Sequence, residues 1–217
     1  MLRQSSRKLA TLLISVFCFY LFYPIPAHSQ TPVTIDKNLF GNLEARPIGP
    51  AVMSGRISCL DALATDFRLI YVGTASGGVW KSKNAGTTFK PVFDDYCQSI
   101  GAITIDQQRP DTVWVGTGET WVRNSVSVGD GIYRTSDGGE KWEKKGLENS
   151  ERIARILIHP DNPDIVYVAV MGHLWNANEE RGVYKTTDGG ATWQKILYVD
   201  ENTGCSDLSM DPENPDV

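Results

Sequence analysis

The sequence has few of the residues that bind metals or form disulfides. Its 217 residues include four cysteines and three histidines, which form neither a Cys-x-x-Cys pair nor a His/Cys cluster. Cys18 lies in an N-terminal segment that we expect to be removed, which leaves Cys59, Cys97 and Cys205. An odd number of cysteines allows at most one disulfide within the chain, and its pairing stays open. We therefore expect no metal, no other cofactor and no disulfide framework.

Runs of basic residues are also absent. The chain has 21 Lys and Arg against 26 Asp and Glu, which gives a formal net charge of −5 at pH 7. An acidic chain without a basic patch binds nucleic acid or an anionic membrane surface poorly, because like charges repel. We therefore expect no nucleic-acid partner. Carbohydrate or peptide and protein ligands remain, and the oligomeric state stays open.

A long apolar run occurs only near the N-terminus, at residues 9–23, after the basic residues Arg3, Arg7 and Lys8. In a helix these residues span about 22 Å, which is less than the roughly 30 Å of a hydrocarbon core. Small residues at both ends of 27–29 fit a cleavage site, so we predict a signal peptide over residues 1–29. The protein is then secreted or periplasmic, without a stable membrane span after cleavage. An uncleaved membrane anchor is the alternative.

The chain does contain a repeated motif. It reads "SKNAGTTF" at 82–89, "TSDGGEKW" at 135–142 and "TTDGGATW" at 186–193. The amide or acidic position is residue 84, 137 or 188, so the periods are 53 and 51 residues. Periods of this size are typical of repeat architectures. The motif residues are Ser82, Asn84, Gly86, Phe89, Thr135, Asp137, Gly139, Trp142, Thr186, Asp188, Gly190 and Trp193.

Three β-rich runs precede each copy of the motif. In the second repeat they are "IGAITI", "TVWVGT" and "GIYRTS", and in the third "IARILI", "IVYVAV" and "GVYKTT". Val, Ile, Tyr and Trp bounded by Gly, Pro, Asp and Asn are typical of strands and hairpins. With a fourth strand after the motif, each unit of about fifty residues predicts four antiparallel strands, which describes one blade of a β-propeller.

This pattern predicts an all-β chain with three blades and the start of a fourth. We expect an N-terminal extension at 30–50 and a partial β-propeller at 51–217. Its repeats run over about 51–97, 98–150, 151–203 and a truncated 204–217. The truncated repeat ends in the turn "DPENPD", and the turn prolines 110, 163 and 215 are spaced 53 and 52 residues apart.

The repetition indicates a structural role for the motif. Its Asp can accept hydrogen bonds from backbone N–H groups in a tight turn, its Gly can supply a positive φ, and its Trp or Phe can bury a ring between sheets. A catalytic or metal-binding role is the alternative, but a catalytic Asp rarely needs a copy in every blade. Asn84 and Phe89 in the first copy also suit a turn better than a reaction centre.

The three copies resemble the Asp-box (BNR) repeats of sortilin-type propellers, sialidases and xyloglucanase-type glycoside hydrolases. The text over about 46–217 is similar to large exported proteins with a sortilin-like propeller, many of them labelled glycosyl hydrolases. The resemblance implies a catalytic Asp just after the second strand of the first blade, but Ala75 stands there. That mechanism therefore does not carry over, and the arginine triad of sialidases cannot be assembled from motifs here.

The loops between the second and third strands differ in length among the repeats. From Val72 to Trp80 the spacing is 8 residues, from Val115 to Tyr133 it is 18, and from Val168 to Tyr184 it is 16. Insertions on one face of a repeat protein often mark its binding face. We predict ligand contacts among Glu119, Trp121, Arg123, Asn124, His173, Trp175 and Glu180. Asn178 and Arg181 lie in the same insertions, and the alternative is that the loops bury their Trp rings and pair their Arg side chains internally.

These loops leave the function open between three classes. Exposed Trp beside Asn, Arg and carboxylates suits sugars, and it equally suits peptides, so we expect a module that binds a glycan or peptide. A glycoside hydrolase is the second possibility. It needs two carboxyls about 5–10 Å apart, for which Glu119 with Glu179 or Glu180 are the candidates. A purely structural assembly module is the third.

Overall fold

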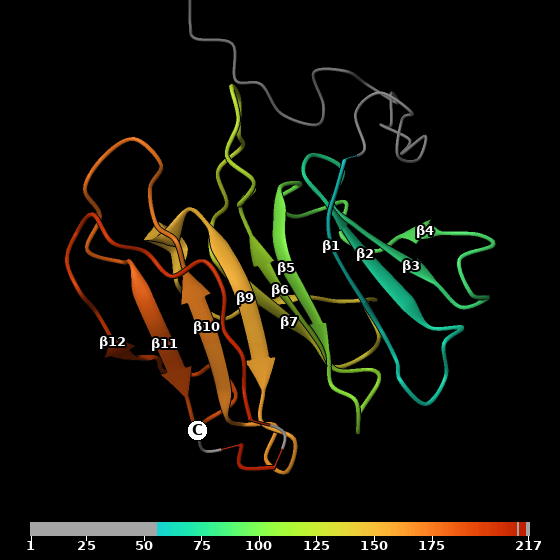
Figure 1. Ribbon diagram of the computed structural model, residues 1–217. Coiled ribbons are helices and arrows are strands. Elements are labelled where there is room, and N and C mark those ends of the chain that lie inside the picture. Colours follow the sequence, from blue (N-terminus) through green and yellow to red (C-terminus); the bar gives the residue numbers. More distant parts are fainter. Residues whose placement is uncertain (1–55, 212, 216–217) are drawn as a thin grey trace, which may run out of the picture. The chain divides into compact units, whose positions relative to one another are not determined.

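The computed structural model describes residues 56–211 and 213–215. The expected signal peptide and N-terminal extension lie outside these residues. In the described part, twelve strands form three separate four-stranded antiparallel sheets (Figure 1). Within each sheet, strands that follow one another in sequence are hydrogen-bonded neighbours. The predicted all-β class and the predicted four strands per repeat are confirmed.

Each sheet corresponds to one of the three complete repeats. The strands of the first sheet are β1 (Ile57–Ala62), β2 (Ile70–Thr74), β3 (Val79–Ser82) and β4 (Lys90–Pro91). Those of the second are β5 (Ile100–Ile105), β6 (Val113–Thr117), β7 (Ile132–Thr135) and β8 (Glu143–Lys144). Those of the third are β9 (Ile153–Ile158), β10 (Val166–Val170), β11 (Gly182–Thr186) and β12 (Gln194–Leu197). A short 3₁₀ helix, η1 (Glu148–Ser150), leads into the third sheet.

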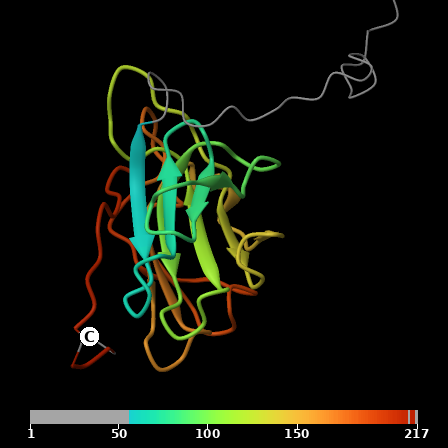
Figure 2. The ribbon, with the colours of Figure 1, turned by 90° about the vertical axis from the view of Figure 1, so that its right-hand side faces the viewer.

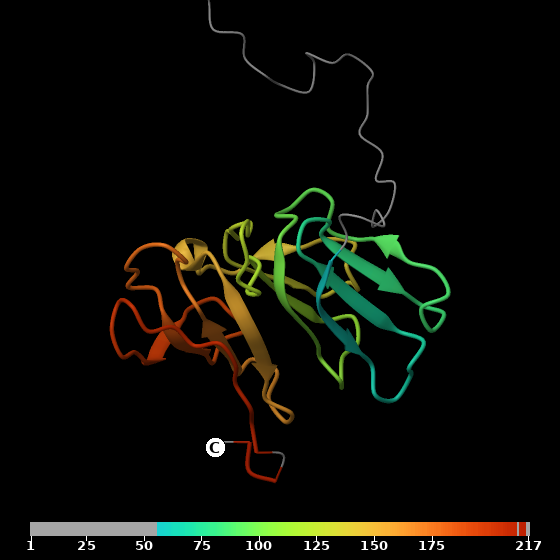
Figure 3. The same ribbon diagram turned by 45° about the horizontal axis from the view of Figure 1, so that its top comes forward.

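The first strands of the sheets lie beside one another, β1 next to β5 and β5 next to β9 (Figures 1 and 3). Hydrogen bonds join them across the gaps between sheets. The backbone N–H of Ile105 donates to Asp61 Oδ2 at 2.8 Å, and the Thr104 hydroxyl donates to the Ile156 carbonyl at 2.8 Å. Loops and turns gather at the two ends of the strands (Figure 2).

Two apolar cores fill the spaces between successive sheets. The first joins Tyr71 and Phe93 of the first repeat to Trp142 of the second. The second joins Trp114 of the second repeat to Trp193 of the third. Each core contains one edge-to-face aromatic pair. The ring centroids are 5.1 Å apart in Phe93–Trp142 and 6.1 Å apart in Trp114–Trp193. Such contacts add to the free energy of burying the rings, so each core holds one sheet against the next.

Residues 204–211 form no regular strand, although the sequence predicts the first strand of a fourth repeat there. The segment is tied to the third sheet by the Cys205 N–H, which donates to the Val170 carbonyl at 3.0 Å. Cys59, Cys97 and Cys205 are all free thiols. Within the described ranges, no helix is long and apolar enough to cross a membrane, and no cluster of His, Cys, Asp and Glu is arranged to hold a metal ion.

Candidate functional site: the two long loops at one end of the sheets

The Asp-box turns are residues 82–89, 135–142 and 186–193. In each of them, motif side chains accept hydrogen bonds from backbone N–H groups of the same turn. The Thr135 hydroxyl donates to Asp137 Oδ1 at 2.7 Å and accepts from the Gly139 N–H at 3.0 Å. Asp137 Oδ1 also accepts from the N–H groups of Glu140 and Lys141, both at 3.0 Å. The bond from Lys141, followed by that from Thr135, lowers the pKa of Asp137. This carboxylate is therefore engaged by its own turn.

The other two turns have the same geometry. Asp188 accepts from the Thr192 N–H at 2.9 Å and from the Thr192 hydroxyl at 2.6 Å, and these bonds lower its pKa. Asn84 accepts from the Thr88 N–H at 2.9 Å through its amide oxygen. Gly190 has a φ of +85°, and a Cβ there would lie 2.7 Å from the Trp114 ring. The turn therefore requires glycine at this position both for its backbone angle and for close packing of the sheets.

The long loops lie at the opposite end of the strands from these turns. In the second sheet, Val113 pairs with Thr135 at the end that leads into the Asp-box turn. Gly116 pairs with Ile132 at the other end, where residues 118–131 connect the two strands. The third sheet repeats this arrangement, with residues 171–181 between β10 and β11.

The loop at 118–131 presents an exposed tryptophan on a fixed base. The Trp121 side chain is 69% exposed, and Arg123 and Asn124 beside it are exposed. The base is closed by Thr117, whose hydroxyl accepts from the N–H groups of Asp130 at 2.8 Å and Gly131 at 3.0 Å. The tip of this loop is thus accessible while its ends are held.

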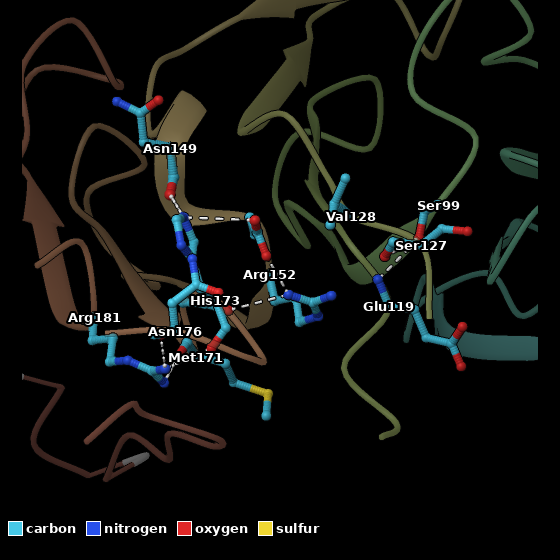
Figure 4. A network of polar contacts seen from close by, with 12 residues as sticks. Ser99, Glu119, Ser127, Val128, Asn149, Arg152, Met171, His173, Asn176 and Arg181 are labelled. Atoms are coloured by element: carbon cyan, nitrogen blue, oxygen red, sulfur yellow. Dashed lines mark hydrogen bonds and ion pairs between the residues drawn. The ribbon is translucent and has the colours of Figure 1, made fainter. Parts of the chain in front are cut away.

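Glu119, in the same loop, is only 3% exposed and forms an ion pair with Arg56. Its backbone N–H donates to the Ser99 hydroxyl at 2.9 Å (Figure 4). Its carboxylate is therefore buried and paired within the protein. We remove Glu119 from the predicted ligand contacts for this reason.

The loop at 171–181 is shaped by an internally bonded arginine. The Arg181 guanidinium donates to the carbonyls of Met171 at 2.6 Å and His173 at 2.5 Å (Figure 4). It also donates to the Glu201 carbonyl at 2.8 Å. This is the internal pairing that the sequence left as an alternative. Trp175 remains 78% exposed at the tip of the loop.

Of the remaining polar residues of this loop, two are hydrogen-bonded within the protein and one is exposed to solvent. Asn178 is buried, and its N–H donates to the Glu201 carbonyl at 2.8 Å. Glu180 accepts from the Tyr184 hydroxyl of β11 at 3.3 Å. Glu119 is instead bonded to Arg56 of the first repeat and Ser99 of the second. Glu179 is exposed. The proposed carboxyl pair thus has one buried member already neutralised by an arginine.

Sequence reasoning missed the segment that supports both loops, residues 149–152. The Gly129 N–H of the first loop donates to the Glu151 carbonyl at 2.7 Å, and the Met171 N–H of the second donates to the Arg152 carbonyl at 3.0 Å. His173 Nε2 lies 3.2 Å from the Asn149 carbonyl oxygen and 3.6 Å from Glu151 Oε1 (Figure 4). Both loops therefore rest on one piece of backbone.

Two features of this segment mark it as a rigid support. Arg152 is 2% exposed and donates to Glu151 Oε2 at 2.6 Å. Glu151 has a positive φ of 53°, a conformation that non-glycine residues adopt only when their surroundings enforce it. The segment joins two repeats and carries no motif of its own, so no pattern in the sequence points to it.

A cavity of about 490 Å³ opens next to the first loop. Its walls are the first strands of the three sheets together with Thr120, Trp121 and Val122 of the first loop and Met171 of the second. Arg155 and Asp207 add charge to it, with Arg155 Nε 3.6 Å from Asp207 Oδ1. Cys59 also lines the wall, where burial raises the pKa of its thiol to about 12 and keeps it uncharged. The cavity is a hollow whose walls mix polar and apolar groups in similar measure, so it can offer both hydrogen bonds and apolar contact to a ligand.

Four-stranded antiparallel sheets in succession, with loops gathered at one end and Asp-box turns at the other, define a β-propeller module. Residues 77–216 match the Sortilin-Vps10 family, described as sortilin, neurotensin receptor 3. The match covers more than half of the chain, and the chain belongs to this family. The predicted resemblance to sortilin-like and xyloglucanase-like propellers is confirmed.

Curated relatives are glycoside hydrolases. A xyloglucanase of a Paenibacillus species is 25% identical over 145 residues, which cover 59% of this chain and 13% of that enzyme. A xyloglucanase of Hypocrea jecorina (strain QM6a) is 29% identical over 142 residues, which cover 58% of this chain and 16% of that enzyme. The chain thus spans less than a quarter of the length of these relatives.

Solved structures share the fold. An ancestral GH74 enzyme superposes with a TM-score of 0.51 at 20% identity, over 67% of this chain and 19% of that one. A chain of the nidogen/laminin complex superposes with a TM-score of 0.51 at 14% identity, over 70% of this chain and 51% of that one. At these identities the likeness concerns the fold alone.

Proposed function

We propose that this chain is a β-propeller module of an exported protein and binds a glycan or peptide through the end of the sheets that carries residues 118–131 and 171–181. The observation that carries the proposal is Trp121. Its ring is 69% exposed on a loop whose base is hydrogen-bonded, and it borders the cavity of about 490 Å³. A large exposed aromatic on a rigid support binds at a low cost in conformational entropy.

The polar groups around Trp121 suit a hydroxylated or amide-rich ligand. Arg123 and Asn124 stand exposed beside it, and Thr120, Arg155 and Asp207 line the cavity. Sugar rings stack their C–H faces on aromatic side chains while their hydroxyls exchange hydrogen bonds with such groups. Peptides use the same combination of Trp and Arg as anchors. Xyloglucanase relatives favour a glycan, while the neighbour from the nidogen/laminin complex shows the fold in a protein assembly.

Glycoside hydrolysis is the second candidate, because curated relatives are named xyloglucanases. It would require two carboxyls facing one sugar bond. Ala75 is buried at the position where the resemblance implies an Asp, and Glu119 is paired with Arg56. Hydrolysis would therefore depend on carboxyls other than these, and binding needs fewer assumptions. A structural assembly module, the third candidate, predicts no binding to either ligand class.

The test is Trp121→Ala combined with Trp175→Ala in the full-length protein, assayed on glycan and peptide arrays. We expect affinity for the bound class to fall by about tenfold or more, the size of effect seen when an aromatic anchor is truncated. Phe67→Ala is the matched control, because Phe67 is 73% exposed in the turn between β1 and β2, at the other end of the strands. Unchanged binding by a stably folded double variant would remove this face from consideration. Cleavage of xyloglucan oligosaccharides by the unaltered protein would support the hydrolase.

A further inference from the structure

Three lysines gather around the first Asp-box turn, although the sequence contains no basic run. Lys81 and Lys90 lie directly opposite each other across β3 and β4, so their side chains share one face of the sheet. Lys83 follows where β3 leads into the turn. Strand β4 is the outermost strand of this sheet (Figure 1). The hairpin therefore brings three positive charges to one place.

The corresponding cross-strand pairs of the other two sheets carry different charges. The pair is Arg134 with Glu143 in the second sheet and Lys185 with Gln194 in the third. Like charges that lie directly opposite each other destabilise a sheet, whereas opposite charges stabilise it. Among the three described sheets, the first alone therefore has a repulsive pair at this position.

The first turn also lacks the carboxylate of the other two, because Asn84 stands where they have Asp137 and Asp188. The formal charge is +3 over residues 81–91, which contain three lysines and no acidic residue. It is 0 over 134–144, with three basic and three acidic residues, and +1 over 185–195, with two and one. Asn84 keeps the hydrogen bond from the Thr88 N–H, so the turn is preserved while the lysine charges stay unbalanced.

Two of the three lysines have no partner of opposite charge. Within the residues that the structure describes, neither Lys83 nor Lys90 forms an ion pair. Lys81 is held in place, because its Nζ donates to the Gly138 carbonyl at 2.7 Å. Burial, followed by the charge of Lys83, lowers the pKa of Lys81. Three carboxylates of the second repeat oppose this shift in part, and they are Asp111, Glu140 and Asp137.

A cavity of about 280 Å³ lies at this cluster. It is lined by the three lysines, by Asn84, Thr88 and Val92 of the first repeat and by Glu140 of the second. Its volume is close to the lower end of the roughly 300–1,000 Å³ found for small-molecule sites. Lysine ammonium groups donate to an anionic group, whereas the Glu140 carboxylate repels one and accepts from hydroxyls. The walls therefore suit a ligand that carries both an anionic group and hydroxyls.

We propose that this cavity, which we call the Lys83–Lys90 site, binds a sugar unit that carries a carboxylate or a sulfate. Lys83 and Lys90 bind the anionic group, which also relieves the repulsion between Lys90 and Lys81. Glu140 accepts hydrogen bonds from the sugar hydroxyls. The site lies at the Asp-box end of the sheets, so it goes beyond the proposed function and does not depend on ligand binding by the loops at the other end.

The first test measures binding of the full-length protein to matched probes by calorimetry at low ionic strength, since exposed charges are screened by salt. The probes are oligogalacturonate, a sulfated galactan oligosaccharide, an uncharged galactan oligosaccharide, inorganic sulfate and polyglutamate. We expect one acidic sugar to bind at least tenfold more tightly than the last three probes, and its identity distinguishes carboxylate from sulfate. Equally tight binding of the uncharged sugar, of sulfate or of polyglutamate would overturn the proposal, as would no binding of either acidic sugar.

Variants then locate the site. Lys83→Gln with Lys90→Gln should lower the affinity for the acidic sugar by about tenfold or more, because two charged donors are lost. Lys141→Gln is the matched control, since Lys141 is exposed on the Asp-box turn of the second repeat and does not line the cavity. Trp121→Ala should also leave this affinity unchanged. Loss of binding in Trp121→Ala, with full binding in the double lysine variant, would assign the acidic sugar to the loop end and overturn the proposal.

A charge reversal gives a readout that does not depend on the choice of sugar. Lys90→Glu creates at this position the opposite-charge pair that the second sheet has, so it should raise the thermal unfolding midpoint by about 1 °C or more without ligand. Saturating acidic sugar should raise the midpoint of the unaltered protein and leave that of Lys90→Glu unchanged. A lower midpoint for Lys90→Glu, or equal stabilisation of both proteins by the sugar, would contradict the Lys83–Lys90 site.

Discussion

Among single residues, the Ser or Thr that begins each Asp-box turn is better buried than the Asn or Asp two positions later. Thr186 is 1% exposed, donates to Asp188 Oδ1 at 2.7 Å and accepts from the Gly190 N–H at 3.0 Å. Gly190 is itself buried against Trp114 of the preceding sheet. The hydroxyl therefore satisfies an N–H group that water cannot reach, which makes it the most sensitive point of the turn.

We predict that Thr186→Val lowers the free energy of unfolding by about 1–3 kcal/mol, because it leaves a buried N–H without an acceptor. Thr187→Val is the matched control, since Thr187 is exposed, and it should change the same quantity by less than about 0.5 kcal/mol. Urea unfolding of the three proteins measures the difference. Equal stability of the two variants would show that the turn does not depend on its hydroxyl.

The sequence predicted residue types at the site better than residue roles. Trp121 and Trp175 are exposed at loop tips, where the insertions placed them. Glu119 and Arg181 came from the same insertions and looked equally available, but one is paired with Arg56 and the other with backbone carbonyls. Those partners lie far along the chain or on the main chain, and neither leaves a pattern in the sequence.

Among the structural elements, the first three strands of each sheet were predictable because each carries its own signal, whereas the fourth follows from its place after the repeated motif. Val, Ile, Tyr and Trp in the core and Gly or Asp at the ends repeat with a period close to fifty residues. The support at 149–152 carries no such signal. It acts through backbone groups of Glu151 and Arg152, and any residue has a carbonyl to offer. Contacts of this kind follow from the packing of three sheets and not from side-chain identity.

The loop at 171–181 offers a prediction at the same scale. Arg181→Gln removes most of the bonds that gather this loop around one guanidinium, so amide hydrogen exchange over residues 172–180 should accelerate by about tenfold or more. The sheets should keep their protection. Arg123→Gln is the control, because Arg123 is exposed at the tip of the other loop. Unchanged exchange in Arg181→Gln would mean that Met171 and the 149–152 segment hold the loop without the arginine.

For the molecule as a whole, the repeated interface explains how short strands form a stable unit. Strands β4 and β8 have two residues each, so neither sheet gains much from its last strand. The sheets are also held together by rings that each sheet buries in its neighbour, as Trp142 and Trp193 do. The loops at one end can then vary in length while the Asp-box turns at the other end hold successive sheets together.

Residues 1–29 carry a testable prediction about export. Xyloglucanases and sortilin-type proteins are typically extracellular or secreted, and residues 1–29 have the order of a signal peptide, with a basic start, an apolar run and small residues. We predict that the exported protein begins at Gln30, and N-terminal sequencing measures this. Because residues 1–29 carry three basic and no acidic side chains, cleavage also changes the formal charge from −5 to −8, which isoelectric focusing detects. An exported protein that retains Met1 would favour a membrane anchor instead.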